Sequence, residues 1–370
     1  MSRVALLTPR LDMRDAVGND ILGMEAVLRD LGHDCRIFAE GWNTDRKVYH
    51  VRKLPAFLKS PDDILLYHYS IGWERALQLF EGLTCRKILR YHNVTPPDFF
   101  EPYHAGIANS CRVARRLLPR FIAAGCDLYL SNSEFSRRDL LEHGAPEKLT
   151  HVVPPFHQID RLFDMEPDLA TLGEYSMDFP RGIANILMVG RIVPNKGYET
   201  LIRAFALYHL HYNPSSRLIL TGKLDPQLET YYGGLREIIA EHGLAEAVVF
   251  TGVVPDNVLK ALYLSASLFM TMSEHEGFCV PLVEAMALKI PIVAYGSSAI
   301  AETLGDGGLI WEENDPVVVA ASLQKILSDP DLGYSLGSAG FARYESVFRA
   351  EIIDERLRSA LQLLETAPAS

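Results

Sequence analysis

The chain has 370 residues, enough for two domains of roughly 150 to 200 residues that each bury a core. Its composition, 48% hydrophobic and 22% charged, is that of a folded globular protein and excludes a disordered chain. The net charge of -11 argues against a nucleic-acid-binding protein, because such proteins need a positive balance to neutralise phosphates. We therefore expect no nucleic-acid partner.

The cysteines are odd in number and scattered, and no two form a C-x-x-C pair. They are Cys35, Cys85, Cys111, Cys126 and Cys279. This pattern indicates neither a disulfide framework nor a zinc site, so we expect a reducing, cytoplasmic compartment. The apolar run near the N-terminus is too short for a signal peptide, and no run approaches the ~20 apolar residues that span a bilayer. We expect any membrane contact to be peripheral, on the inner face of the plasma membrane.

In the first half of the chain, short apolar runs alternate with amphipathic segments. Helical spacing of apolar residues predicts helices at 20–33 and 107–124. The apolar runs predict strands at 4–8, 35–39, 63–69, 87–93 and 128–133. Strands that alternate with helices are typical of a parallel sheet covered by helices on both faces.

The second half of the chain starts the same alternation again. Its runs predict strands at 184–190, 216–222, 247–254, 268–273 and 291–296. Its amphipathic segments predict helices at 198–208, 227–242, 256–264 and 281–288. The fold class is therefore α/β, with two Rossmann-like, doubly wound parallel-sheet domains.

The boundary between these domains is expected in the polar segment 164–185, which has no sustained period, with a hinge near Met177. We predict an N-terminal domain at 1–177 and a C-terminal domain at 178–350. Residues 351–370 should form a last amphipathic helix and a tail, with the helix packing back toward the N-terminal domain.

The first candidate site follows the strand "ANILMVG", in the stretch "RIVPNKGYETLIRAF". In open parallel sheets, ligands bind beyond the carboxyl ends of the strands. Arg191 and Lys196 here precede a predicted helix, and two cations beside a helix N-terminus favour an anion such as a diphosphate. The alternative is that Arg191 pairs with a surface acid and that "NKG" is only a turn.

A second candidate site is the stretch "MSEHEGFCVPLVEAMAL", Met272 to Leu288, which follows the strand "LFMTMS". Pro281 is suited to start a helix, and the helix dipole could explain an acid such as Glu284 near its first turn. The dipole does not explain Glu276, which precedes Gly277 in the loop. A carboxylate accepts hydrogen bonds well from a vicinal diol such as a ribose, so the pair also fits a ligand site.

Together these residues resemble the retaining glycosyltransferases of family 4, also called group 1 glycosyltransferases. The two glutamates in "EGFCVPLVEAMA" match the family's paired-glutamate signature, and "GRIVPNKGYETLIRAF" matches its diphosphate-binding loop. Further segments that are similar to the family are "YHNVTPPDFF", "SNSEFSRRDLLEHG", "VVFTGVVPDNVLKALYLSASLFMTMS" and "PIVAYGSSAIAETLGDGG". The resemblance covers nearly the whole chain and implies the GT-B fold, in which two Rossmann-like domains face a central cleft.

Carried over to this chain, the resemblance implies that Glu284 binds the ribose of a sugar nucleotide and that Glu276 faces the donor sugar. Arg191 and Lys196 would bind the diphosphate and neutralise the leaving group. The remaining nucleotide-sugar-binding residues would be Gly222, Val253, Val254, Gly277, Phe278, Cys279 and Val280, with the two valines near the base.

In the N-terminal half, "AVGNDI" stands where the family has a glycine-rich loop under the diphosphate. Only Gly18 remains of the usual paired glycines, and Asn19 follows it. His92 in "YHNVTP" matches the histidine that approaches the transferred sugar, so the implied catalytic residues are His92, Glu276, Arg191 and Lys196. His68 is a second cleft candidate. The alternative for His92 is a hydrogen-bonded histidine at a strand end.

The implied reaction transfers a hexose, most simply glucose or mannose, from a UDP- or GDP-sugar to a glycan or lipid-linked hydroxyl in polysaccharide biosynthesis. The anomeric configuration is kept, and the departing phosphate takes the acceptor proton. We expect no metal and no other cofactor. The one D-x-D spacing, Asp329 and Asp331, reads as a polar turn between helices. The sequence does not identify the base, the sugar or the acceptor.

The segment "CRVARRLLPRF" predicts a basic amphipathic helix that could contact an anionic membrane, although such charges more often only face solvent. Its arginines are Arg112, Arg115, Arg116 and Arg120. A GT-B epimerase or phosphorylase and a non-catalytic nucleotide-sugar-binding protein stay as alternatives. A nicotinamide-dependent dehydrogenase is disfavoured, because no G-x-G-x-x-G follows the first strand.

Overall fold

The computed structural model describes residues 2–12, 15–176 and 183–366. Its contacts divide the chain into two compact units. Unit 1 comprises residues 1–101, 105–157 and 349–370, and unit 2 comprises 102–104 and 158–348. The chain thus passes from one unit to the other at His157, while the predicted hinge near Met177 lies outside the described residues. The C-terminal helix belongs to unit 1.

Unit 1 contains, among its described residues, a seven-stranded parallel sheet in the order β3-β2-β1-β4-β5-β6-β7. The strands are β1 (Arg3–Asp12), β2 (Asp34–Asn43), β3 (Tyr49–His50), β4 (Ile64–Tyr69), β5 (Arg86–Tyr91), β6 (Leu128–Ser131) and β7 (Thr150–Val152). The α-helices are α1 (Ala16–Asp30), α2 (Leu54–Phe57), α3 (Glu74–Gly82), α4 (Ala105–Ala123), α5 (Glu134–Glu142) and α15 (Ala350–Thr366).

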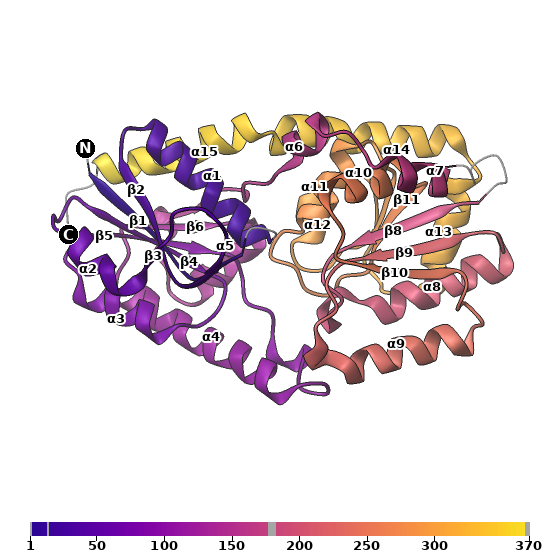
Figure 1. The fold of residues 1–370 in the computed structure, drawn as a ribbon, viewed down its shortest axis with the longest axis horizontal. Helices are drawn as coiled ribbons and strands as arrows, with labels where there is room; N and C mark the ends of the chain where they lie inside the picture. The colour runs from indigo at the N-terminus through magenta and orange to yellow at the C-terminus, as the bar shows by residue number, and fades with distance from the viewer. Residues whose placement is uncertain (1, 13–14, 177–182, 367–370) are drawn as a thin grey trace. The chain divides into compact units, whose positions relative to one another are not determined.

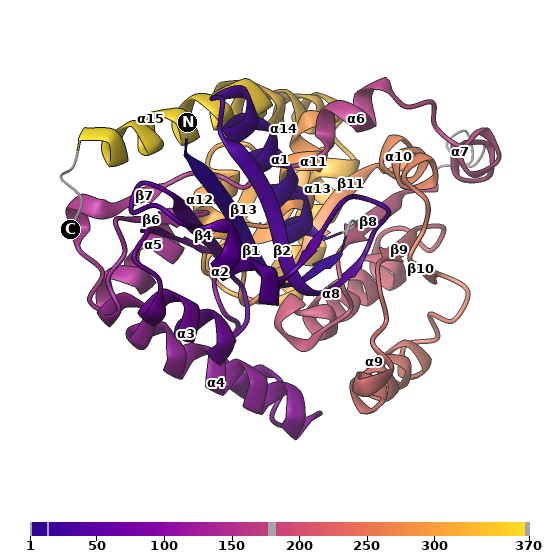
Figure 2. The same ribbon diagram turned by 60° about the vertical axis from the view of Figure 1, so that its left-hand side comes forward.

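Alternate residues of each strand point to opposite faces of this sheet, and both faces are buried. On β1, Val4 and Leu6 pack into a core formed with α1 and α15. Ala5 and Leu7 pack into a second core formed with α2, α3 and α4. Figure 1 shows α1 and α15 on one side of the sheet and α2 to α4 on the other, and Figure 2 shows α3 beside α4.

Unit 2 contains, in the part that the structure describes, a six-stranded parallel sheet in the order β10-β9-β8-β11-β12-β13. The strands are β8 (Asn185–Val189), β9 (Arg217–Thr221), β10 (Val248–Gly252), β11 (Leu268–Thr271), β12 (Ile292–Tyr295) and β13 (Leu309–Trp311). The α-helices are α6 (Ile159–Asp164), α7 (Leu169–Ser176), α8 (Tyr198–His211), α9 (Glu229–Glu241), α10 (Asp256–Ser265), α11 (Val280–Ala287), α12 (Ile300–Leu304), α13 (Pro316–Leu327) and α14 (Pro330–Arg343). A π-helix, η7 (Tyr344–Phe348), follows α14.

The prediction of two doubly wound α/β domains is confirmed by these two parallel sheets. In unit 2, α8 packs against α9 and α13, and α11 packs against α14. The helix expected at 227–242 instead begins with a 3-10 turn, η6 (Pro226–Leu228), before α9 starts at Glu229. Within the described residues, no helix is both long and apolar enough to cross a bilayer.

The loop between β8 and α8 depends on a glycine. Gly197 has a φ of 64°, in the left-handed region, and a Cβ built there would lie 1.9 Å from the carbonyl oxygen of Met272. Gly197→Ala should therefore lower the free energy of unfolding by about 2 kcal/mol or more, through backbone strain and displacement of Met272, which follows β11. Urea unfolding of the full chain measures this.

The matched control is Gly233→Ala in α9, where the added Cβ has open space around it. This change should raise the free energy of unfolding by about 0.5–1 kcal/mol, because alanine loses less backbone entropy in a helix than glycine does. Equal unfolding midpoints for the two variants would contradict the described loop geometry.

Candidate functional site

The loop that carries Arg191 is held from beneath by two buried tyrosines. Tyr198 Oη donates to the Gly190 carbonyl oxygen at 3.1 Å, and Tyr232 Oη donates to the Ile192 carbonyl oxygen at 3.1 Å. The backbone N–H groups of Gly190 and Ile192 pair with the β9 side, at 2.9 and 3.0 Å. The backbone on both sides of Arg191 is therefore fixed on its N–H and C=O groups.

The Arg191 side chain itself is exposed. It forms no ion pair with any residue that the structure describes, so the predicted alternative of a surface acid is not found there. An exposed guanidinium on a rigid loop is available for an anion from solution.

Lys196 lies at the end of the 3-10 helix η5 (Pro194–Lys196), and its ammonium forms an ion pair with Glu276 Oε1. The side chains are 13% and 10% exposed. Lys196 comes from the loop after β8 and Glu276 from the loop after β11, and these strands are neighbours in the sheet. The structure thus brings together two of the predicted catalytic residues, which are 80 positions apart in sequence.

The loop that carries Glu276 is held by hydrogen bonds from two sides. Asn195 Nδ2 donates to the His275 carbonyl oxygen at 2.9 Å, and the Asn195 carbonyl oxygen accepts from Glu274 N at 2.9 Å. Glu276 N donates to Ser298 Oγ at 2.8 Å. These bonds pre-organise the carboxylate before any ligand arrives.

Helix α11 begins directly after this loop, with Cys279 at its N-cap in the left-handed region, at a φ of 79°. A non-glycine residue there carries strain, which clusters at functional sites. Burial raises the pKa of the Cys279 thiol, so it stays protonated. Phe278 is buried, its carbonyl oxygen accepts from Thr303 Oγ1 at 2.8 Å, and Gly277 and Val280 are partly buried.

Glu284 is the fifth residue of α11, and the first turn of this helix contains no acid. The dipole explanation, which applies to the first turn, therefore does not account for it. Tyr263 Oη donates to Glu284 Oε2 at 2.6 Å. Burial raises the pKa of Glu284 and the Tyr263 hydrogen bond lowers it, with a net rise. The carboxylate is partly buried and keeps one oxygen, Oε1, outside this bond.

The other residues of unit 2 that were predicted to bind the nucleotide sugar include three that lie at strand ends. Gly222 has a φ of 152°, and a Cβ there would lie 1.9 Å from the Gly190 carbonyl oxygen, so the Arg191 loop can pass only over a glycine. Val253 and Val254 follow β10, where Val253 is exposed. Asp329, in the D-x-D spacing, caps α14 by accepting from Leu332 N at 3.1 Å.

In unit 1, Gly18 and Asn19 lie in the first turns of α1. Gly18 N donates to Asp15 Oδ1 at 2.6 Å, and a Cβ at Gly18 would lie 2.0 Å from the Asp12 carbonyl oxygen. The close approach of the β1 end to α1 is a sufficient reason for this glycine, so its role toward a diphosphate stays a prediction.

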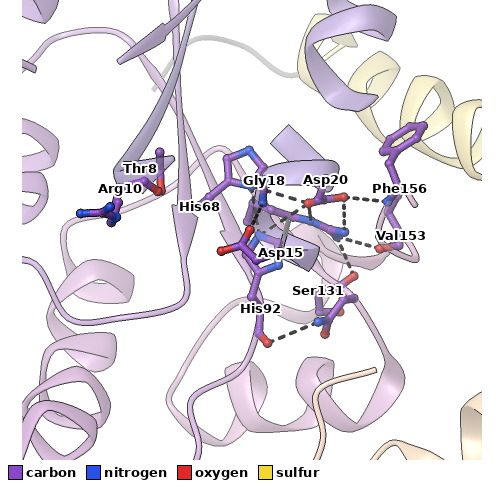
Figure 3. A network of polar contacts seen from close by, with 12 residues as sticks. Thr8, Arg10, Asp15, Gly18, Asp20, His68, His92, Ser131, Val153 and Phe156 are labelled. Atoms are coloured by element: carbon purple, nitrogen blue, oxygen red, sulfur yellow. Dashed lines mark hydrogen bonds and ion pairs between the residues drawn. The ribbon is translucent and has the colours of Figure 1, made fainter. Parts of the chain in front are cut away.

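His92 and His68 belong to a buried polar cluster in unit 1 (Figure 3). Their rings are joined by a hydrogen bond of 3.0 Å between His68 Nδ1 and His92 Nε2. Asp20 Oδ2 lies 3.6 Å from the first atom and 3.5 Å from the second. Arg90 binds both carboxylate oxygens of Asp20, at 2.8 and 3.1 Å. His92 is therefore hydrogen-bonded at the end of a strand, and its contact with a sugar stays a prediction.

Sequence reasoning missed Asp20 and Arg90. Arg90 did carry a signal, because it is a charge inside the apolar strand run "KILRYHN", and a buried charge needs a partner. Its partner Asp20 was hidden at the start of a predicted helix, where an acid is unremarkable. Only the fold brings these positions, 70 apart in the chain, into contact.

The charges of this cluster are set by burial. Burial lowers the pKa of His68 well below its ordinary value, and it lowers the pKa of His92 to about 4. Burial alone would raise the pKa of Asp20, but Arg90 and the two histidines outweigh it and lower this pKa. Both histidines are therefore neutral at pH 7, and Asp20 is ionised.

Part of the chain matches a known protein family. Residues 179–343 match the model of the glycosyl transferases group 1, the family that the sequence motifs resemble. Mannosylfructose-phosphate synthase from Agrobacterium fabrum is 27% identical over 258 residues, which cover 66% of this chain and 56% of that protein. The GDP-mannose-dependent alpha-(1-6)-phosphatidylinositol monomannoside mannosyltransferase of Mycobacterium tuberculosis is 27% identical over 260 residues, covering 68% and 65%. The match thus spans less than two thirds of either relative.

Two solved structures share the fold over their whole length. HepE from Anabaena, in complex with UDP and glucose, has a TM-score of 0.78 at 16% identity and covers 98% of this chain. Sucrose-phosphate synthase from Thermosynechococcus elongatus has a TM-score of 0.78 at 19% identity and covers 100%. These neighbours confirm the predicted GT-B fold. The narrower assignment to family 4 stays a prediction.

The ion pair between Lys196 and Glu276 has a consequence for stability. Lys196→Met should lower the free energy of unfolding by about 3 kcal/mol, because it leaves the buried Glu276 charge without its partner. The double variant Lys196→Met/Glu276→Gln should recover most of that loss, since no charge is then stranded. Urea unfolding of both variants measures the difference, and a double variant no more stable than the single one would refute it.

The buried histidines predict an acid-sensitive stability. A histidine has a pKa of about 6.5 in the unfolded chain. Between that value and the folded pKa of His92, about 4, the unfolded state binds a proton that the folded state does not. Stability is therefore fully present above about pH 6.5 and falls with decreasing pH by up to about 1.4 kcal/mol per pH unit for each histidine.

Measuring the free energy of unfolding at about pH 7.5, 6.0 and 5.0 would give this slope. His92→Gln should flatten it, while His211→Gln, on the exposed side of α8, should leave it unchanged. Equal slopes for all three proteins would rule out a neutral, buried His92.

Proposed function

We propose that this protein is a glycosyltransferase that moves a hexose from a nucleoside diphosphate sugar to an acceptor hydroxyl. The observation that carries the proposal is the arrangement at the carboxyl ends of β8 and β11. There the exposed Arg191 and the paired Lys196 and Glu276 lie on adjacent loops that are held by hydrogen bonds. The group 1 match over 179–343 supports the same activity.

In the proposed complex, Arg191 and Lys196 bind the diphosphate. Arg191 is free of ion pairs among the described residues, whereas Lys196 shares its charge with Glu276. As the bond to the sugar breaks, negative charge grows on the departing phosphate, and both cations stabilise it more than they stabilise the bound donor. Gly222 and the two tyrosines beneath the loop hold Arg191 in place for this step.

Glu276 would orient the donor sugar by accepting hydrogen bonds from its hydroxyls, and Glu284 would accept from the ribose hydroxyls. Val253 and Val254 would lie beside the base. We assign no nucleophilic role to Glu276, because in a same-face mechanism the departing phosphate takes the acceptor proton and no carboxylate attacks the sugar. The reaction would keep the anomeric configuration, with the departing phosphate taking the acceptor proton. The cations would neutralise the diphosphate, so no metal is required.

The donor proposed is a UDP- or GDP-sugar that carries glucose or mannose, and the acceptor a glycan or a lipid-linked sugar in polysaccharide biosynthesis. A relative named for GDP-mannose-dependent mannosyl transfer and a structural neighbour solved with UDP and glucose support these two donor classes. Screening UDP- and GDP-sugars by thermal shift would separate them, because a bound donor stabilises the folded state.

The proposed peripheral membrane contact is made through α4. The apolar side of α4, including Leu117 and Phe121, is buried in the core of unit 1. Arg112 pairs with Glu101, and Arg120 lies 3.8 Å from Glu81. Any contact would therefore be electrostatic, and flotation with vesicles that contain anionic lipid should show binding that salt abolishes.

The activity has a direct test with the full chain, a UDP- or GDP-hexose and candidate acceptors. Nucleoside diphosphate should be released only when acceptor is present, and EDTA should not change the rate. Arg191→Met should lower kcat by about 10²–10³-fold, the usual effect of removing one group that stabilises transition-state charge. Arg203→Met, on the exposed side of α8, is the matched control and should retain full activity.

Release without acceptor, or a rate that EDTA abolishes and Mn²⁺ restores, would contradict the proposed mechanism. Conversion of the donor with no transfer would indicate an epimerase, and binding without turnover would indicate a nucleotide-sugar-binding protein.

A further inference from the structure

The buried cluster of unit 1 brings an ion pair and two histidines together at the ends of parallel strands. Four side chains meet there, and only His92 is exposed to solvent, to a small extent. They are Asp20 from α1, His68 from β4, Arg90 from β5, and His92 directly after β5. Polar groups are buried only when they gain hydrogen bonds or serve a function. Figure 3 shows the two imidazole rings on one side of Asp20.

The carboxylate of Asp20 is already neutralised. Arg90 binds both of its oxygens, and Phe156 N donates to Oδ1 at 2.9 Å. The remaining guanidinium nitrogen of Arg90, Nη1, donates to the carbonyl oxygens of Ser131 and Val153, at 3.1 and 2.7 Å. The ligand atoms of Asp20, His68 and His92 lie within 4.8 Å of one another, as in a metal site. A dication there would meet the buried Arg90 charge with no spare negative charge to offset it.

The single hydrogen bond between the histidines can form in two ways, because either His68 Nδ1 or His92 Nε2 carries the proton. Asp20 does not decide between them, since its Oδ2 lies 3.6 Å from one nitrogen and 3.5 Å from the other. The opposite ring nitrogen of His68 does decide. His68 Nε2 is buried and has no hydrogen-bond partner among the described residues.

If His68 were protonated at Nε2, an N–H donor would be buried without an acceptor, which native proteins rarely tolerate. If His68 is protonated at Nδ1, only a lone pair is left unused. His68 then donates to His92 Nε2, and the proton of neutral His92 must be on Nδ1. The backbone of His92 is held on both sides, because His92 N donates to the Tyr69 carbonyl oxygen at 2.9 Å and the His92 carbonyl oxygen accepts from Asn132 Nδ2 at 3.3 Å.

We propose that His68 fixes His92 in the tautomer protonated at Nδ1, so that His92 meets its substrate as a neutral hydrogen-bond donor and not as a base. The substrate half of this inference rests on the proposed glycosyl transfer, whereas the tautomer does not. His92 Nε2, the lone pair that a base would use, is occupied by His68. His68 is thus a positioning residue, because it sets which nitrogen of His92 carries the N–H donor.

The test is the ¹⁵N spectrum of the full chain labelled in histidine, because a protonated and an unprotonated imidazole nitrogen have well-separated shifts. We expect His92 to be protonated at Nδ1 and unprotonated at Nε2, without a change between pH 8 and about 5.5, well above its lowered pKa. A proton on His92 Nε2, titration of His92 in this range, or a joint shift of both histidines on adding Zn²⁺ would overturn the proposal.

Two variants then test the link to function. His68→Leu removes the donor and should lower kcat about tenfold, as expected for one lost hydrogen bond, with a donor KM that changes less than about twofold. His68→Asn keeps a donor near the position of Nδ1 and should restore most of kcat. Equal rates for the two variants would contradict the positioning role. The proposed function fails instead if wild-type protein transfers no hexose, and the tautomer is read on wild-type protein whatever the outcome.

Discussion

The ion pair between Lys196 and Glu276 is the interaction on which the proposed donor site depends. It joins the loops that follow two neighbouring strands, and it is mostly buried, so each charge relies on the other. The surrounding hydrogen bonds of Asn195, Ser298 and Tyr198 hold the two loops in register. An anion that binds Lys196 must compete with Glu276, which couples diphosphate binding to release of the carboxylate that would face the sugar.

Unit 1 has a comparable constraint in the pair between Asp20 and Arg90, which is buried more deeply. Taking two charges out of water costs several kcal/mol per ion, so this pair is not an economical way to stabilise a fold. What it provides is order: Arg90 ties α1 to the carboxyl ends of β6 and β7, and it leaves the two histidines beside a neutralised carboxylate. Both units thus use a buried ion pair to fix polar side chains at the ends of parallel strands.

The strands and helices that hold these sites could be predicted from periodicity, since runs such as "ANILMVG" and "LFMTMS" are buried parallel strands. Arg191, Lys196, Glu276 and Glu284 could be selected because they follow strand ends. The contacts between positions far apart in the chain could not be predicted, because pairing of Lys196 with Glu276 or of Asp20 with Arg90 depends on strand order. The tyrosines beneath Arg191 gave no local signal at all, since hydroxyls on a helix face look like ordinary core residues.

Titration calorimetry with the nucleoside diphosphate of the preferred donor, without its sugar, tests most directly whether Lys196 must leave Glu276 to bind the diphosphate. Glu276→Gln releases Lys196 from its partner and should bind the nucleoside diphosphate about fivefold more tightly than wild type, the equivalent of about 1 kcal/mol. Lys196→Met should bind it more weakly than wild type. Affinities that are the same for all three proteins would show that the diphosphate does not meet this ion pair, and the account of the donor site would be wrong.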